Sequence, residues 1–266
     1  MPLDELQRRI AATLKNCRSR QSFVGGSSVF NETFPRRSDD IDIYVEDRPI
    51  EEIVARDVDA LRASGLDVAV NRQFYGFLIE AVVSDGSDKT KLEWNEADRR
   101  RFFPIEANET FGWALHKADL AVQKLIAAAT RRVARDPVDV ILIDRLYAPA
   151  AALALAAPAK LEGVSPTALL ERVRLNAIGH PLEDYLALRV DLSQMPFELK
   201  EIKMMVIDMV ERAIETILNR CILAEPGYIY LSQLSSTPVI PTDGVIDGLQ
   251  KHAASERGVT PFFTPL

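Results

Sequence analysis

The stretch from Phe23 to Val45, FVGGSSVFNETFPRRSDDIDIYV, combines a glycine-containing turn with an acidic strand. Residues 40–45 alternate between polar and apolar types, which predicts a strand with isoleucines on one side and Asp40 and Asp42 on the other. Residues i and i+2 of a strand point the same way, so these two carboxylates project together. Carboxylates held this close repel each other unless a cation lies between them. The pair therefore predicts a divalent-cation site.

The residues before the acidic strand are suited to binding phosphate. Gly25 and Gly26 let the backbone approach a phosphate closely, and the turn at Ser27 opens into a helix predicted over residues 27–33. Mg²⁺ is typically held by one or two carboxylates together with substrate phosphates. We therefore expect this turn to bind a nucleoside triphosphate (NTP) next to one or two Mg²⁺ ions. The charged loop before the acidic strand either contacts this substrate or is solvated; it contains Arg36, Arg37 and Ser38.

A third carboxylate, Glu93, stands among apolar neighbours in the predicted strand TKLEW at residues 90–94. We expect Glu93 to lie beside Asp40 and Asp42 in the sheet and to complete the metal site. Such a site activates a hydroxyl group for in-line attack on the α-phosphorus of a nucleotide. Glu93 could also accept the proton of the attacking hydroxyl. The alternative for all three carboxylates is a solvent-facing position on a strand.

Composition sets limits on partners. The 266-residue chain carries a net charge of −7, which disfavours a surface covered uniformly by nucleic acid. A local basic patch that binds nucleic acid is one interpretation of Arg99–Arg101 and of Arg131–Arg135. An ordinary solvated surface is the alternative for each. The N-terminal segment has no signal-peptide pattern, and no apolar run is long enough to span a bilayer. We expect a cytoplasmic protein that does not enter membranes.

The organisation of the chain predicts an α/β (α+β) part with a small mixed sheet, followed by an α-helical part. The expected domains are residues 1–107, 108–222 and a C-terminal extension at 223–266. Helices are expected in the first part at 3–17, 27–33 and 50–64, and in the second at 111–131, 136–147, 151–162, 166–177 and 196–221. Ser165 is the expected N-cap of the fourth of these later helices. The extension contains a strand-like segment at 227–232 and a helical segment at 244–255.

Basic residues recur in the first helices of the second part. Lys124, Arg131 and Arg135 follow one another at steps of seven and four, so they share one face if a single helix persists. Such a stripe could grip triphosphate oxygens, with lysine as a point charge and arginine as a bidentate donor. The alternative is an ordinary exposed helix face. Asp136 is expected to cap the next helix, and Asp139 to pair with Arg135.

These motifs resemble a known family. The Gly-Gly-Ser turn, the Asp-x-Asp strand and the later lone carboxylate are similar to the minimal pattern of the DNA polymerase β-like nucleotidyltransferases. The stretch LHKADLAVQKLIAAATRRVARDPVDVILI, residues 115–143, resembles the Lys…Arg…Arg-Asp-x-x-Asp signature of the AbiEii-type nucleotidyltransferases. The resemblance covers residues 20–147. The chain departs from it in having Gly-Gly-Ser-Ser where Gly-Gly-Thr-Ser is more usual, and in Pro137 directly after Asp136.

AbiEii-type enzymes are the toxin halves of type IV toxin–antitoxin pairs. The resemblance therefore implies transfer of a nucleoside monophosphate from an NTP to an RNA 3′ end, with tRNA as the family precedent, and an antitoxin protein as partner. One alternative is a nucleotidyltransferase that modifies a small molecule such as an antibiotic, which the acidity of the chain favours slightly. Another is a nucleotide-binding regulator without turnover.

Overall fold

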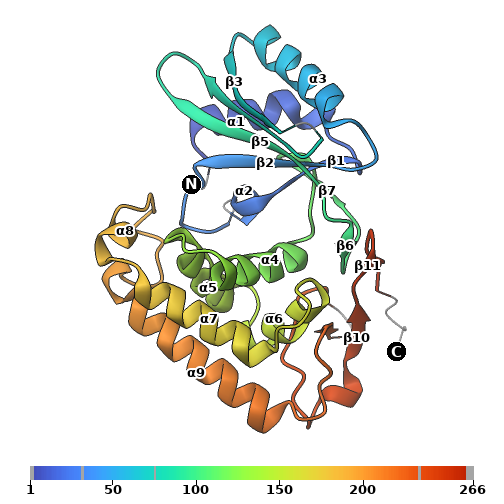
Figure 1. The fold of residues 1–266 in the computed structure, drawn as a ribbon, viewed down its shortest axis with the longest axis vertical. Coiled ribbons are helices and arrows are strands. Elements are labelled where there is room, and N and C mark those ends of the chain that lie inside the picture. Colours follow the sequence, from blue (N-terminus) through green and yellow to red (C-terminus); the bar gives the residue numbers. More distant parts are fainter. Residues whose placement is uncertain (1–2, 31–32, 75, 233–234, 262–266) are drawn as a thin grey trace. The chain divides into compact units, whose positions relative to one another are not determined.

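A computed structural model describes residues 3–30, 33–74, 76–232 and 235–261 (Figure 1). The chain divides into two compact units. Unit 1 consists of residues 1–99, 105–117 and 189–194, and unit 2 consists of residues 100–104, 118–188 and 195–266. Unit 1 is mixed α/β and unit 2 is mainly helical, so the expected fold class is confirmed.

Unit 1 is built on a mixed sheet of seven strands in the order β3-β4-β5-β2-β1-β8-β7. Strands β2 and β5 pair in parallel, as do β1 and β8, and the other neighbours are antiparallel. The central strand β2 has the bounds that the alternation of the sequence predicted. The strands are β1 (Ser22–Gly25), β2 (Asp40–Val45), β3 (Asp67–Phe74), β4 (Leu78–Ser84), β5 (Lys89–Glu96), β7 (Glu106–Asn108) and β8 (Gly112–Ala114).

The sheet of unit 1 has an apolar face, which helices cover, and an opposite face that is polar. Helices α1 (Glu5–Leu14) and α3 (Ile50–Ala63) pack against each other and against strands of the sheet (Figure 1). Trp94 of β5 is fully buried and donates from Nε1 to Asp57 of α3 at 2.9 Å. Because side chains alternate along a strand, Glu93 projects from the opposite face.

A buried ion pair lies under α3. Arg18 donates to the carboxylate of Asp57, which is fully buried and also accepts from Arg56 at 3.1 Å and from Trp94. Burial lowers the pKa of Arg18, in opposition to the charge and hydrogen bond of Asp57, which raise it. Three donors thus offset the negative charge of the buried Asp57 carboxylate, which lies on the side of the sheet opposite its polar face.

A segment distant in sequence supports the loop before β2. Residues 189–194 belong to unit 1 and pair with this loop through its backbone. Arg37 donates its amide to the carbonyl of Arg189 at 2.9 Å, and Asp191 donates to the carbonyl of Pro35 at 2.8 Å. The Arg189 guanidinium also pairs with Asp39, directly before the acidic strand. No local pattern in the sequence indicates this long-range pairing.

Unit 2 contains most of the helices, and α7 and α9 run side by side in it (Figure 1). Ser165 accepts from the amide of Ala168 at 3.2 Å and caps α7, as predicted. Two predicted helix starts are wrong: residues 112–114 form β8 before α4 begins, and α9 begins six residues later than 196. The helices are α4 (Lys117–Thr130), α5 (Arg135–Leu146), α6 (Ala150–Ala156), α7 (Pro166–Gly179), α8 (Leu182–Leu186) and α9 (Ile202–Arg220).

The C-terminal extension belongs to unit 2. The strand expected near 227–232 is present as β9 (Tyr228–Leu231), but the helix expected at 244–255 is wrong. Only a short 3₁₀ turn, η4 (Ile246–Gly248), forms there before β10 (Gln250–Ala253) pairs with β9. The pairing buries His252 beside Ile229, so tertiary contacts override the local helical pattern.

The end of the extension holds residues 100–104. Strand β11 (Ser255–Glu256) pairs with β6 (Arg100–Arg101), and His252 Nε2 lies 2.7 Å from the carbonyl of Phe102. Arg99 and Arg100 are exposed and Arg101 is buried, so the alternative of a solvated loop is wrong only for Arg101. Among the helices that the structure describes, none alone is long and apolar enough to cross a membrane; residues 135–146 and 150–159 pass such a test only as a pair bent by 111°.

Candidate metal centre

The register between β2 and β5 places three carboxylates together. Asp42 lies opposite Glu93 in this parallel pair, and Asp40 lies opposite Lys91. Oxygens of Asp40, Asp42 and Glu93 all lie within 4.8 Å of one another. Asp40 is buried, and the other two are half-buried. The structure therefore brings the three candidate ligands into one cluster on the polar face of the sheet.

The glycine turn lies against this cluster. Strand β1 pairs antiparallel with β2, which sets Gly25 opposite Asp42. The next residue, Gly26, has a φ of 67° and begins the short helix α2 (Gly26–Phe30). A β-carbon on Gly26 would lie 1.8 Å from Oδ2 of Asp42. Glycine is thus required here by both its backbone conformation and the space that the carboxylate occupies. Ser27 is buried at the start of the same helix.

Ser38 fixes the orientation of Asp40. Its hydroxyl donates to Oδ1 of Asp40 at 2.8 Å, and its carbonyl accepts from Nε2 of Gln7 at 2.8 Å. Ser38 and Arg36 are both buried, and Arg36 donates to the carbonyl of Arg37 at 2.7 Å. The reading of residues 36–38 as an ordinary solvated loop is therefore wrong for two of the three residues. Their position orients the acidic strand.

Lys91 is a member of the site that the sequence analysis missed. Its Nζ donates to Oε1 of Glu93 and lies 4.0 Å from Oδ2 of Asp40. Burial lowers the pKa of Lys91, but the hydrogen bond to Glu93 and the charges of Glu93, Asp40 and Glu80 outweigh it and raise that pKa. The signal was available: Lys91 and Glu93 are two residues apart, so strand alternation places them on one face.

Lys124, the first basic candidate in unit 2, pairs with an acidic residue. Its Nζ lies 3.0 Å from Oδ2 of Asp139, and both side chains are less than 10% exposed. Arg135, not Lys124, is the partner that the sequence predicts for Asp139. The nucleotide-binding role expected for Lys124 stays a prediction.

The shared basic face depended on one helix persisting, and that condition is not met, because α4 ends at Thr130 and Arg135 begins α5. The two helices agree with the separate helices expected at 111–131 and 136–147. Pro137 explains the break, since a proline in a continuous helix would lose a hydrogen bond and clash with the carbonyl four residues earlier. Asp136 does not cap α5; instead it accepts two hydrogen bonds from Arg131, at 2.7 and 2.9 Å. The nucleotide-binding roles of Arg131 and Arg135 stay predictions.

Similarity to a known protein is found among solved structures. No family model matches the chain, and no curated protein matches it. Among solved structures, the chain is similar to MenT4, a nucleotidyltransferase toxin from Mycobacterium tuberculosis, with 12% sequence identity and a TM-score of 0.48. The likeness covers 79% of this chain and 82% of that chain. The function proposed below rests on the geometry of the site.

The acidic cluster fits a hard divalent cation. It offers carboxylate oxygens from three side chains within bridging distance of one another. Oxygen donors of this kind suit Mg²⁺, Mn²⁺ or Ca²⁺, whereas zinc sites are usually built with nitrogen or sulfur ligands. A β-carbon on Gly26 would overlap the carboxylate of Asp42, so glycine lets that ligand keep its place in the cluster. The donor set therefore fits such an ion.

Proposed function

We propose that this chain is a metal-dependent nucleotidyltransferase, which moves a nucleoside monophosphate from an NTP to a hydroxyl group. One observation carries the proposal: Asp40, Asp42 and Glu93 converge on one sheet face, with the Gly26 backbone directly against Asp42. An acidic cluster next to a backbone without side chains suits a metal-bound triphosphate. The same arrangement has no evident purpose in packing, because three neighbouring carboxylates repel one another.

Asp40 and Asp42 are the proposed metal ligands, and Glu93 completes their site. Bound Mg²⁺ would supply charge neutralisation at the α-phosphoryl group and at the departing pyrophosphate. Ser38 holds Asp40 in a fixed orientation through the hydrogen bond to Oδ1, and Oδ2 lies 4.0 Å from the Lys91 ammonium. Hence a ligand oxygen is positioned before any substrate arrives.

Glu93 is also the proposed acceptor of the proton from the attacking hydroxyl. The acceptor oxygen forms a bond to the α-phosphorus while the bond from that phosphorus to the bridging oxygen of the β-phosphate breaks. The products are a nucleotidylated acceptor and pyrophosphate, and the hydroxyl proton passes to the carboxylate. Gly25, Gly26 and Ser27 are proposed to contact the phosphates through their backbone, which only glycine lets approach so closely.

We further propose that the chain acts as an AbiEii-type toxin, with an RNA 3′ end as acceptor and an antitoxin protein as partner. The support is the residue pattern at 20–147 together with the acidic cluster that the pattern requires. The net charge of −7 is the observation that favours a small-molecule acceptor instead. These two acceptors differ in size, so a single labelling experiment distinguishes them.

The test is incubation of the protein with each α-labelled NTP, Mg²⁺, total RNA and a pool of small hydroxyl compounds that includes antibiotics, followed by separation of RNA from small molecules. Label on RNA that is absent with an Asp42→Asn variant supports the toxin proposal. Label on a small hydroxyl compound, with none on RNA, supports the alternative acceptor. Binding of NTP without transfer to any acceptor would show a nucleotide-binding regulator and contradict the enzymatic proposal.

A further inference from the structure

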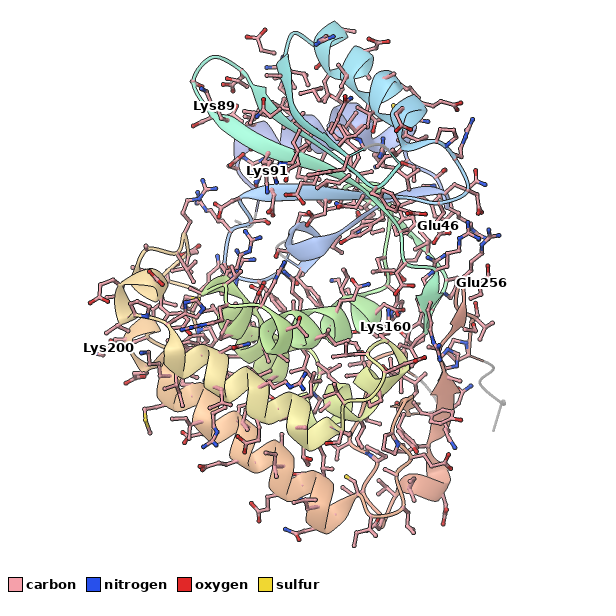
Figure 2. The ribbon with its side chains drawn as sticks, viewed as in Figure 1. Glu46, Lys89, Lys91, Lys160, Lys200 and Glu256 are labelled. Carbon is pink, nitrogen blue, oxygen red and sulfur yellow. The ribbon has the colours of Figure 1, made fainter. Side chains whose placement is uncertain are left out.

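Lys91 extends from β5 into the acidic cluster. Figure 2 labels Lys91 and Lys89 along the same strand, and their spacing places them on the same face. The ammonium group of Lys91 hydrogen bonds to Glu93 and lies 4.0 Å from Asp40. The cation thus contacts two of the three carboxylates that are proposed to hold metal.

Charge explains why a cation is favoured at this position. Oxygens of three carboxylates lie within 4.8 Å of one another, and the Lys91 ammonium lies against two of these groups, so its positive charge offsets part of their repulsion. A divalent ion at the same cluster would bind the same carboxylates and neutralise the same negative charge. The ammonium and the ion therefore compete for Glu93 and Asp40.

The Lys91 side chain can move away from the acidic cluster because it is partly exposed to solvent. Its side chain is 41% exposed, whereas that of Lys124, in the ion pair with Asp139, is only 9% exposed. An ammonium on a flexible four-carbon chain is strongly hydrated and can move into solvent at little cost. Lys91 is therefore held by charge rather than by packing.

We propose that Lys91 is an internal counter-cation of the metal centre, which a divalent ion displaces from Glu93 and Asp40 when it binds. This inference rests on the metal site of the proposed function. Lys91 stabilises the metal-free protein because it reduces repulsion among the carboxylates. It also weakens the affinity for the ion, because its own ion pairs must be broken first.

The experiment measures Mn²⁺ binding by isothermal titration calorimetry in the full chain. Lys91→Met keeps the length of the side chain and removes the charge. Lys89→Met is the matched control, since Lys89 is exposed on the same strand and makes no ion pair among the described residues. Asp42→Asn identifies the cluster as the place where the ion binds.

We expect Lys91→Met to bind Mn²⁺ about tenfold more tightly than the wild type, the order of effect for one opposing charge at a partly exposed site. Lys89→Met should bind like the wild type, and Asp42→Asn should lose most of the affinity. In EDTA, Lys91→Met should unfold about 2–4 °C lower than the wild type, because repulsion among the carboxylates is then uncompensated. Saturating Mn²⁺ should remove that difference.

Two results would overturn the inference. The first is equal or weaker Mn²⁺ affinity in Lys91→Met, with binding still lost in Asp42→Asn. This result would show that Lys91 does not compete with the ion, and the proposed metal site would still stand. Absence of Mn²⁺ binding in the wild type and in Lys91→Met alike would overturn the metal site itself, and the role of Lys91 with it.

Discussion

The backbone of Gly26 lies directly against the carboxylate of Asp42, so that a β-carbon added to Gly26 would be 1.8 Å from Oδ2. This contact joins the glycine turn to the acidic strand. It connects two motifs that are sixteen residues apart in the sequence, and it makes the turn part of the metal centre rather than a separate loop.

Gly26→Ala is expected to displace Asp42 and to abolish Mn²⁺ binding and nucleotidyl transfer. The added methyl group cannot fit beside the carboxylate, and the positive φ adds backbone strain of about 1 kcal/mol or more. Gly86→Ala is the matched control, because Gly86 also has a positive φ but nothing within 4 Å of an added β-carbon. Calorimetric Mn²⁺ binding checks both variants. Equal Mn²⁺ affinity in the two would contradict the proposed contact.

Asp57→Ala is expected to lower the free energy of unfolding by about 3–5 kcal/mol, because it leaves the buried Arg18 without its ion-pair partner. Asp59→Ala, on the exposed side of the same helix, should change stability by less than about 0.5 kcal/mol. Urea unfolding followed by circular dichroism measures both values. A loss as small for Asp57→Ala as for Asp59→Ala would show that the buried pair contributes no net stability.

Lys124→Met is expected to destabilise the chain by about 3–5 kcal/mol, since it removes the ion-pair partner of the buried Asp139. Lys124→Met combined with Asp139→Leu should recover most of that loss, because both charges are then removed together. If Lys124 also binds nucleotide, the double variant should be stable yet bind NTP weakly. Wild-type NTP affinity in the double variant would assign Lys124 a purely structural role.

The acidic strand could be predicted from the sequence because its information is local. The alternation over residues 40–45 decides both the strand and the shared direction of Asp40 and Asp42. The position of Glu93 beside them could be expected only from the chemistry of a metal site. It depends on the parallel register of β2 and β5, which no local pattern encodes.

The missed features depend on contacts between distant residues. The extension pattern at 244–255 is helical by itself, yet the strand partner of β10 lies some twenty residues earlier, in β9. The place of Lys91 beside Glu93 follows from strand alternation, whereas its contact with Asp40 depends on the register of β2 and β5. The break before Arg135 was not missed, because Pro137 is a local signal for a new helix and separate helices are expected at 111–131 and 136–147.

The most direct test of the central claim is the rate of pyrophosphate release with NTP, Mg²⁺ and RNA, compared between the wild type and two neighbouring variants. Asp40→Asn should lower the rate on the order of 100-fold or more, because it removes a proposed metal ligand. Asp39→Asn should stay within about twofold, since Asp39 is exposed and pairs with Arg189 outside the cluster. Equal rates in Asp40→Asn and the wild type would contradict the account.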